Sequence, residues 1–565
     1  MGEQQGTPGH LATAADTTGQ AAPATNNATE SSLQQLGRAD RSTTKVYLVG
    51  GGIASLAAAA FMIRDGDILG RNITVLEDLS VLGGSLDGAG SAQDGYVLRG
   101  GRMLESKYLC TFDLFSSIPT LDGSETVTQE ILRWNETMKT SSKSRLVRDG
   151  QRQVAPQFGL SEDHILTVER LVLQPESMLD GTSIADQFDL AFFKTDFWLM
   201  WCTTFAFQPW HSAIEFKRYL ARFAHMVHGF NRLNGIMRTV FNQFDSMVLP
   251  LYKWLEERGV VFALNTSVTD LGFSKHDGME AVTSIVTKHN GEVHDIDVTV
   301  GDYVLVTLGS MTDASSLGTM DTPPVLKDKT DGSAWALWEK IATGRSEFGL
   351  PWVFDDHIDE SKWLSFTATL RTPTFLHMVR DLTGNVPGEG GLVTFPQSNW
   401  LASIVIPHQP HFLGQPDDVS VLWGYGLFVD RPGNFVEKPM SACSGREIMV
   451  EVLGHLHIES EAAEILANTT CIPCMMPFIT SQFLRRESGD RPEVVPAGTR
   501  NLGFIGQYCE LPNDVVFTVE YSIRSAQTAV YALLGLKREP PAVYQGKFDP
   551  RVLYKAFIAL HDIHT

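Results

Sequence analysis

The sequence has little positive charge and little cysteine. Its 565 residues include 45 Lys and Arg against 66 Asp and Glu, a formal net charge of −21, and only six cysteines. Nucleic-acid affinity depends on Lys and Arg that displace counterions from phosphates, so we expect no nucleic-acid partner. Six cysteines are too few for a disulfide scaffold in a chain of this length, and the first residues lack the basic-then-apolar pattern of a secretory leader. We therefore expect a cytoplasmic protein.

A long uninterrupted hydrophobic run is also missing. Residues 197–214 carry no formal charge over about the length of a membrane-spanning helix, but polar residues and Pro209 interrupt them. We predict that this run is an interior wall, with a tunnel for an acyl chain as its functional role. The amphipathic stretch 550–565 favours packing onto the body of a monomer or onto the partner in a homodimer, and a peripheral membrane contact stays open.

Two motifs suggest metal ligands without completing a site. Cys471 and Cys474 form C-x-x-C, but a structural zinc site needs four ligands and no second pair has suitable spacing. His408 and His411 form H-x-x-H, and Pro410 between them prevents a regular helix face. We predict buried structural cysteines and no metal site.

A strand, helix and strand over residues 45–77 predict a dinucleotide site. The run VYLVGGGIASLAAAAFMIRDG changes from a β-branched segment through a glycine cluster to an alanine-rich helix, and RNITVLE indicates a second strand. Gly50 allows a tight turn, Gly52 lets the backbone approach a pyrophosphate, and the small Ser55 lets helix and strand pack closely. Glu77, at the end of the second strand, is placed to accept hydrogen bonds from a ribose diol.

FAD is favoured over NAD as the ligand of this site. A second glycine-rich segment, DLSVLGGSLDGAG, follows Glu77, and GFIGQYCELPNDVVFTVEYSIRSAQTAVYALLG places another loop and helix near the end of the chain. Many flavoproteins return their last strand and helix to a long adenine–ribose–pyrophosphate–flavin ligand in this way, whereas an NAD domain does not usually need it. We therefore predict FAD as the cofactor.

Eight blocks of the sequence resemble the oleate hydratase family, also called the myosin-cross-reactive antigens. They are GGGIASLAAAAFMIRDG, GGSLDGAG, YVLRGGRMLE, CTFDLFSSIP, FNQFDSMVLPLYKWLEERGV, HQPHF, CIPCMMPFITSQF and GQYCELPNDVVFTVEYSIRSAQTAVYALLG, and the resemblance covers about residues 45–560. It implies an FAD-dependent hydratase, a carbon–oxygen hydro-lyase, that adds water across a cis double bond of a long-chain unsaturated fatty acid. The flavin of the family undergoes no net redox change.

The fold class that we expect is α/β, with a Rossmann-like, glutathione-reductase-like FAD-binding domain and a second, largely helical substrate lobe. The expected segments are a disordered tail (1–44), three parts of the FAD-binding domain (45–185, 259–310 and 495–540), a helical substrate lobe (186–258), a substrate-binding domain (311–494) and a C-terminal helical segment (541–565). The expected cofactor-binding residues are Gly50, Gly52, Ser55, Glu77, Gly84, Ser85, Arg99, Gly100, Gly101, Arg102, Val268, Gly506, Asn513, Thr518 and Ser522.

The resemblance fails at the residue that activates water. The family signature is R-G-G-R-E-M, and Arg99 to Arg102 match it, but Met103 holds the position of the Glu. A thioether cannot take a proton from water. Glu105 could substitute if the backbone carries it into the site; the alternative is that Glu105 is structural and that the flavin, a carbonyl or another group activates the water.

Three further site positions depart from the family. Phe241 stands where the family has a Tyr that is proposed to protonate the alkene. Of the Thr, Asn and His that hold the substrate carboxylate, only His411 matches, because Val405 and Pro407 occupy the other two positions. Together with the missing Glu, these changes leave two alternatives open: a flavin-dependent double-bond isomerase or oxidoreductase, and a catalytically silent FAD- and lipid-binding homologue.

Overall fold

A five-stranded parallel sheet carries the dinucleotide motif. The computed structural model describes residues 41–563, so most of the tail expected over residues 1–44 lies outside the described part. The strand order is β20 (Leu502–Ile505), β13 (Tyr303–Thr307), β1 (Val46–Val49), β2 (Ile73–Leu76) and β9 (Val261–Ala263). All four neighbouring pairs are parallel.

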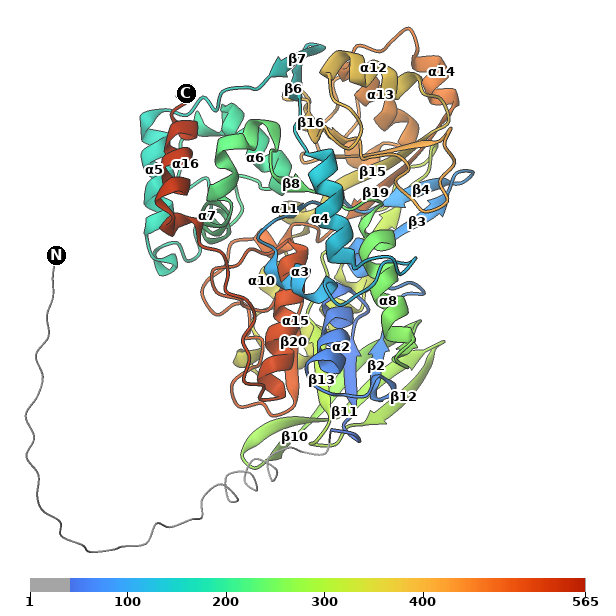
Figure 1. The fold of residues 1–565 in the computed structure, drawn as a ribbon, viewed down its shortest axis with the longest axis vertical. Coiled ribbons are helices and arrows are strands. Elements are labelled where there is room, and N and C mark those ends of the chain that lie inside the picture. Colours follow the sequence, from blue (N-terminus) through green and yellow to red (C-terminus); the bar gives the residue numbers. More distant parts are fainter. Residues whose placement is uncertain (1–40, 564–565) are drawn as a thin grey trace, which may run out of the picture. The chain divides into compact units, whose positions relative to one another are not determined.

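Two helices pack together beside this sheet, α2 (Ile53–Arg64) and α15 (Val519–Leu533) (Figure 1). The alanine run of α2 is fully buried, and its short side chains allow this close packing. The strand, helix and strand predicted over 45–77 are confirmed. The last long helix begins at Val519, because the Thr518 side chain caps it by accepting a hydrogen bond from the Tyr521 N–H.

A three-stranded antiparallel sheet contacts the parallel sheet through β2. It contains β10 (Thr266–His276), β11 (Met279–His289) and β12 (Glu292–Asp297). Between β9 and β10, Asn265 has a φ of 52°, a left-handed conformation that interrupts an extended strand. The chain therefore leaves one sheet and enters the other at this residue.

An eight-stranded sheet forms the core of the second part of the molecule. Its order is β14 (Ser316–Leu317), β19 (Thr469–Met476), β15 (Trp363–Leu370), β18 (Ser420–Gly426), β17 (Ser403–Val405), β16 (Leu392–Thr394), β6 (Ser144–Arg148) and β7 (Gln151–Val154). Strands β6 and β7 fall within the first expected FAD-binding segment, 45–185, yet β6 pairs with β16 of the expected substrate-binding segment and β7 pairs with β6.

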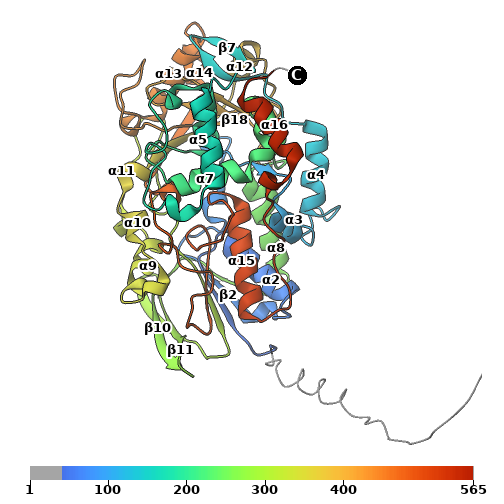
Figure 2. The same cartoon turned by 90° about the vertical axis from the view of Figure 1, so that its left-hand side faces the viewer.

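The hydrophobic run 197–214 covers most of α6 (Asp196–Phe205), the loop after it and the start of α7 (Ala213–Arg222), and it is largely buried, as predicted for an interior wall. Within residues 41–563, no helix is long and apolar enough to cross a membrane. Helix α16 (Pro550–Leu560) packs against the 3₁₀ segment Ala224–Arg232 and lies near α5 (Glu162–Leu173) and α7 (Figures 1 and 2). A membrane contact and the oligomeric state stay predictions.

The remaining elements connect these sheets. The helices are α3 (Leu109–Phe115), α4 (Val127–Met138), α5 (Glu162–Leu173), α6 (Asp196–Phe205), α7 (Ala213–Arg222), α8 (Leu249–Glu256), α9 (Ala334–Ala342), α10 (Trp352–Asp355), α11 (Ile358–Ser361), α12 (Thr374–Thr383), α13 (Gly445–His455), α14 (Ala462–Ala467) and α16 (Pro550–Leu560). Two short ladders pair β3 (Gly88–Ser91) with β4 (Gly95–Leu98), and β5 (Leu104–Glu105) with β8 (Ile236–Met237).

Candidate functional site

The first of three adjoining cavities lies at the Gly50–Gly52 turn and has a volume of about 290 Å³. We call it the nucleotide cavity. The cofactor-binding residues predicted from the sequence that line it are Gly50, Gly52, Glu77, Gly84, Ser85, Arg99, Val268, Gly506 and Ser522. Ser55 lies behind this wall, fully buried, with its hydroxyl 3.3 Å from that of Thr307. It therefore occupies the close contact between α2 and β13 for which a small residue was expected.

The backbone at the start of α2 is suited to an anion. Gly50 has a φ of +92°, and no side chain caps α2 and no acidic residue occupies its first turn. Backbone N–H groups at such a helix end are free to bind a pyrophosphate. A Cβ added to Gly51 would lie 2.8 Å from the Glu77 carboxylate, so only glycine fits beside that side chain.

Glu77 closes the nucleotide cavity at the end of β2. Its carboxylate accepts hydrogen bonds from the Gly51 N–H at 2.5 Å and the Leu79 N–H at 2.8 Å. Burial raises its pKa, although these two backbone donors oppose the shift. A carboxylate retains further lone pairs when each oxygen accepts one bond, so Glu77 can still receive a ribose hydroxyl. The glycine turn, the uncapped helix and Glu77 together fit an adenine dinucleotide.

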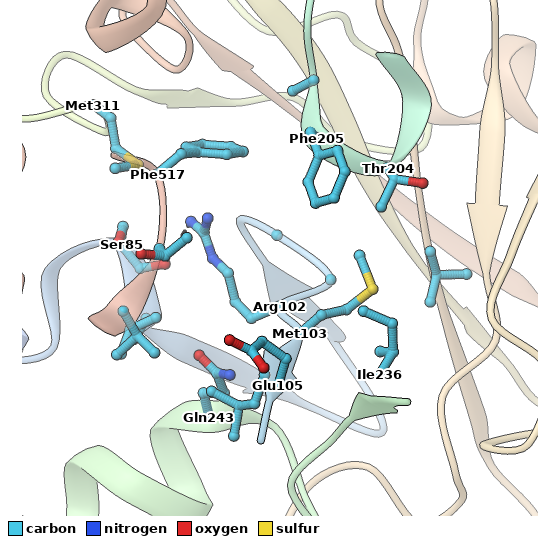
Figure 3. A pocket seen from close by; sticks show the side chains of 18 of the residues that line it. Ser85, Arg102, Met103, Glu105, Thr204, Phe205, Ile236, Gln243, Met311 and Phe517 are labelled. Atoms are coloured by element: carbon cyan, nitrogen blue, oxygen red, sulfur yellow. Dashed lines mark hydrogen bonds between the residues drawn. The ribbon is translucent and has the colours of Figure 1, made fainter. Parts of the chain in front are cut away.

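A second cavity, of about 110 Å³, shares Ile53, Ser85, Met311, Gln507 and Ser522 with the first. We call it the central cavity. The predicted residues that line it are Ser85, Gly100, Gly101, Arg102, Met103, Glu105, Thr518 and Ser522, and Figure 3 shows several of them. Its far wall comes from α6 and the eight-stranded sheet. The central cavity therefore lies between the dinucleotide motif and the second part of the molecule.

Arg102 brings a buried positive charge to the central cavity. Its guanidinium donates to the Ser85 carbonyl at 3.1 Å and lies over the Phe517 ring at 5.6 Å, toward which it points in Figure 3. Its Nε has no hydrogen-bond partner among residues 41–563. Burial lowers the pKa of Arg102 to about 10, so it remains charged at neutral pH. This group fits an electron-rich or anionic ligand, as a flavin would provide.

Met103 and Glu105 both line the central cavity, but their surroundings differ. Met103 lies beside Ile236 in Figure 3, in an apolar part of the wall. The Glu105 carboxylate is occupied by the Arg222 guanidinium at 2.7 Å, the Lys107 N–H at 2.7 Å and the His225 ring at 3.3 Å. The backbone does bring Glu105 to the cavity, as one sequence alternative required, yet its oxygens already have partners.

Three tyrosines also line the central cavity. The hydroxyl of Tyr219 donates to the Val516 carbonyl, and that of Tyr425 donates to the Thr203 carbonyl. The hydroxyl of Tyr108 forms no hydrogen bond within the described residues, 41–563. Burial of Tyr108 raises its pKa well above its ordinary value. Tyr108 belongs to no motif that the sequence analysis identified, so only the fold reveals it.

A third cavity, of about 40 Å³, shares Gly100, Gly101, Arg102, Gln243, Val405 and Trp423 with the central cavity. We call it the headgroup cavity. His411, Val405 and Pro407 line it, so the three positions that the resemblance assigns to the substrate carboxylate come together. Burial lowers the pKa of His411 to about 3, which keeps the ring neutral at physiological pH. Neither Phe241 nor the exposed Asn513 lines any of the three cavities.

Gln243 lies between the central and headgroup cavities and lines both. Neither its amide oxygen nor its amide nitrogen has a hydrogen-bond partner in the described part of the chain. A buried amide without partners is costly, so this position suits a group that binds a water or a ligand. The signal in the sequence was its place within the block FNQFDSMVLPLYKWLEERGV, two residues after Phe241.

Cys471 and Cys474 lie on β19 and are both buried with free thiols, as predicted for structural cysteines. Within residues 41–563, one group of side chains brings three acidic oxygens close enough for a metal, namely Glu339, Asp355 and Asp356. Lys329 forms ion pairs with all three. This group therefore already has a counter-ion.

The sequence matches the MCRA family over residues 43–531. This chain belongs to the MCRA family. An oleate hydratase of Streptococcus pyogenes is 38% identical over 91% of this chain and 89% of its own, and a linoleate hydratase of Lactiplantibacillus plantarum is 32% identical over 92% and 99%. The fold is similar to that of a putrescine oxidase, with 13% identity, a TM-score of 0.50, and coverage of 87% of this chain and 99% of that one. The predicted α/β fold class, with a Rossmann-like domain and a second lobe, is confirmed.

Proposed function

We propose that this MCRA family member adds water across a cis double bond of a long-chain unsaturated fatty acid, with FAD bound in the nucleotide and central cavities. The observation that carries the proposal is the row of three cavities with shared walls, in a chain related over nine-tenths of its length to an oleate hydratase and a linoleate hydratase. The nucleotide cavity receives the adenine dinucleotide part, the central cavity the reacting double bond, and the headgroup cavity the carboxylate end.

FAD, when bound, supplies a polarisable ring whose electrostatics stabilise positive charge that develops on the alkene. The chain's own residues do the remaining work. Arg102 and Phe517, which are in contact in the wall of the central cavity, would hold that ring. Gln243 holds the attacking water through its amide, because both amide atoms lack protein partners within residues 41–563.

Hydration needs a proton for one alkene carbon, and Tyr108 is the group that we assign to give it. Of the three tyrosines that line the central cavity, Tyr108 is the one whose hydroxyl is not bound to a backbone carbonyl of the described residues. Its raised pKa makes it a weak acid, which predicts slow turnover. The oxygen of the water bonds to the other alkene carbon, and its surplus proton returns to the solvent or to Tyr108.

The proposal is tested with purified holoprotein, oleate and linoleate in water labelled with heavy oxygen. The molecular masses of the products are measured by mass spectrometry. The gain of one labelled water is the expected result. An unchanged mass with a moved double bond would identify an isomerase, loss of two hydrogens a desaturating oxidoreductase, and unaltered substrate a silent binding protein. Each of these three outcomes contradicts hydration.

A further inference from the structure

Arg238 is a partly buried cation with no counter-ion among residues 41–563. It follows β8, whose Met237 pairs with Leu104 of β5, so the ladder places Arg238 next to the loop that carries Arg102 and Met103. It lines the headgroup cavity, and its Nε and one terminal nitrogen are buried without a hydrogen-bond partner among residues 41–563. Burial alone lowers its pKa to about 10, and no carboxylate lies near enough to oppose that shift.

A cation with buried, unpaired nitrogens destabilises the folded protein unless an anion binds to it. Removal of a charged group from water costs several kcal/mol in a protein, and the usual compensation is an ion pair with hydrogen bonds. Among residues 41–563, Asp87 is the one acidic residue that lines the same cavity, and it forms its ion pair with Arg99 at 3.1 Å. The two buried nitrogens of Arg238 are therefore left for a ligand.

Two hydrogen bonds hold the backbone of Arg238 in place. Asn135 of α4 accepts a hydrogen bond from the Arg238 N–H at 2.9 Å and donates one to the Arg238 carbonyl at 2.7 Å. These two bonds clamp the residue between α4 and the cavity. A preorganised donor loses less entropy when its ligand binds.

His411 and Thr140, which also line the headgroup cavity, can form hydrogen bonds with a carboxylate. His411 lies close enough to Arg238 for the positive charge of the arginine to add to the lowering of the His411 pKa by burial. His411 Nδ1 and Thr140 Oγ1 are buried and lack partners within the described residues. A neutral His and a hydroxyl offer hydrogen bonds but no charge, so the charge has to come from Arg238.

We propose that Arg238 binds the carboxylate of the fatty acid as its counter-ion, and thereby selects free acids over esters and other neutral derivatives. The proposal rests on the proposed function for the identity of the ligand. Val405 and Pro407 line the same cavity but are apolar, so their side chains cannot donate hydrogen bonds to a carboxylate. In this chain the charge of Arg238 supplies the attraction instead. A cavity of about 40 Å³ takes a group of a few atoms. This size fits a carboxylate and excludes a nucleotide-sized thioester headgroup.

The test uses stearate, which has no double bond, so that binding is measured without hydration. Isothermal titration of the holoprotein is expected to give tighter binding of stearate than of methyl stearate. Arg238→Gln should weaken stearate binding by about 30-fold or more, the usual effect of removing one member of a buried charge pair, and leave methyl stearate unchanged. The matched control is Arg232→Gln, at an exposed arginine of the same segment, which should bind both ligands as the wild type does.

Equal binding of stearate by Arg238→Gln and the wild type would overturn the proposal. So would equal binding of stearate and methyl stearate by the wild type, and this comparison needs no variant to fold. If the wild type hydrates oleate while Arg238→Gln binds stearate normally, the inference fails and the proposed function stands. If no lipid is hydrated but stearate binding depends on Arg238, the proposed function fails and the carboxylate site stands.

Discussion

The carboxylate of Glu105 lies 2.7 Å from the guanidinium of Arg222, and both side chains are almost fully buried. Burial alone would raise the pKa of Glu105, but the hydrogen bond to His225 and the charge of Arg222 outweigh it and hold the pKa below its ordinary value. A carboxylate so well stabilised is a weak base. The contacts therefore support a structural role for Glu105 rather than water activation.

Glu105→Gln should lower stability more than it lowers hydration. Loss of one member of a buried ion pair leaves Arg222 without its counter-ion and costs about 3–5 kcal/mol. Denaturant unfolding should report a loss of this size, while the folded fraction keeps most of its kcat. Glu169→Gln, on an exposed part of α5, is the control and should change neither quantity. A fully stable Glu105→Gln variant that no longer hydrates oleate would instead identify Glu105 as the general base.

Met103→Glu should raise the hydration rate. Met103 lines the central cavity at the position where the signature R-G-G-R-E-M of the resemblance has Glu, and it follows Arg102, whose charge would help to keep a new carboxylate ionised. A positioned general base typically contributes a factor of about 10²–10⁴, so an increase of about tenfold is a conservative expectation. Steady-state kinetics with oleate measure it, with Met103→Gln as the uncharged control. An unchanged rate in a stable Met103→Glu variant would mean that water activation does not limit this enzyme.

Tyr108→Phe should reduce kcat by about a hundredfold with little change in KM, because the substitution removes a proton donor and leaves the cavity shape intact. Its control is Tyr554→Phe on α16, at a side chain that is 64% exposed. Product formation from oleate under saturating conditions is the measurement. Wild-type turnover by Tyr108→Phe would assign the proton to bulk water or to the flavin site.

Gly51→Ala should abolish flavin retention. The added Cβ would lie 2.6 Å from a Leu82 methyl group and 2.8 Å from Glu77 Oε2, so it must displace the side chain expected to hold the ribose. The ratio of flavin absorbance to protein after gel filtration measures this effect. Gly301→Ala is the control, because its Cβ would have one neighbour, at 3.9 Å. Full flavin content in Gly51→Ala would place the cofactor elsewhere.

His211 should contribute a loss of stability as the pH drops below about 6.5. Burial lowers the pKa of His211 to about 3, so between that value and the ordinary 6.5 the unfolded chain binds a proton that the folded chain does not. Folding free energy is thus lost as pH falls, by up to about 1.4 kcal/mol per pH unit for each such histidine.

Glu215 acts in a lower window. Burial would raise its pKa, but Arg491 and Arg486 hold it at about 2, so its contribution is present above the ordinary 4.5 and lost below it. Burial raises the pKa of Asp313 to about 6 and that of Asp355 to about 7, so these two carboxyls bind protons in the folded chain over the same range and oppose the histidine effect. The contribution of His211 is therefore read as the difference in slope between His211→Asn and the wild type, from unfolding free energies measured between about pH 6.5 and 5. His211→Asn, which can still accept the hydrogen bond from the Gln208 N–H, should flatten this slope. An unchanged slope would place the proton uptake on other groups.

Local patterns in the sequence were sufficient for the dinucleotide motif. Gly50, Gly52 and Glu77 lie within one strand–helix–strand unit, so their spacing alone brings them to the nucleotide cavity. Arg238 and His411 come from distant segments, and their approach depends on β8 and on the loop after β17. Whether a charged side chain has a partner depends on all of its neighbours in the fold. A local sequence motif therefore does not reveal an unpaired charge.

The most direct test of the account is hydration of oleate by holoprotein in water labelled with both deuterium and heavy oxygen. The account predicts a hydroxy acid with one heavy oxygen on one former alkene carbon, one deuterium on the other, and flavin in the same redox state before and after turnover. A product without heavy oxygen, or product formation that stops after one flavin equivalent, would contradict it.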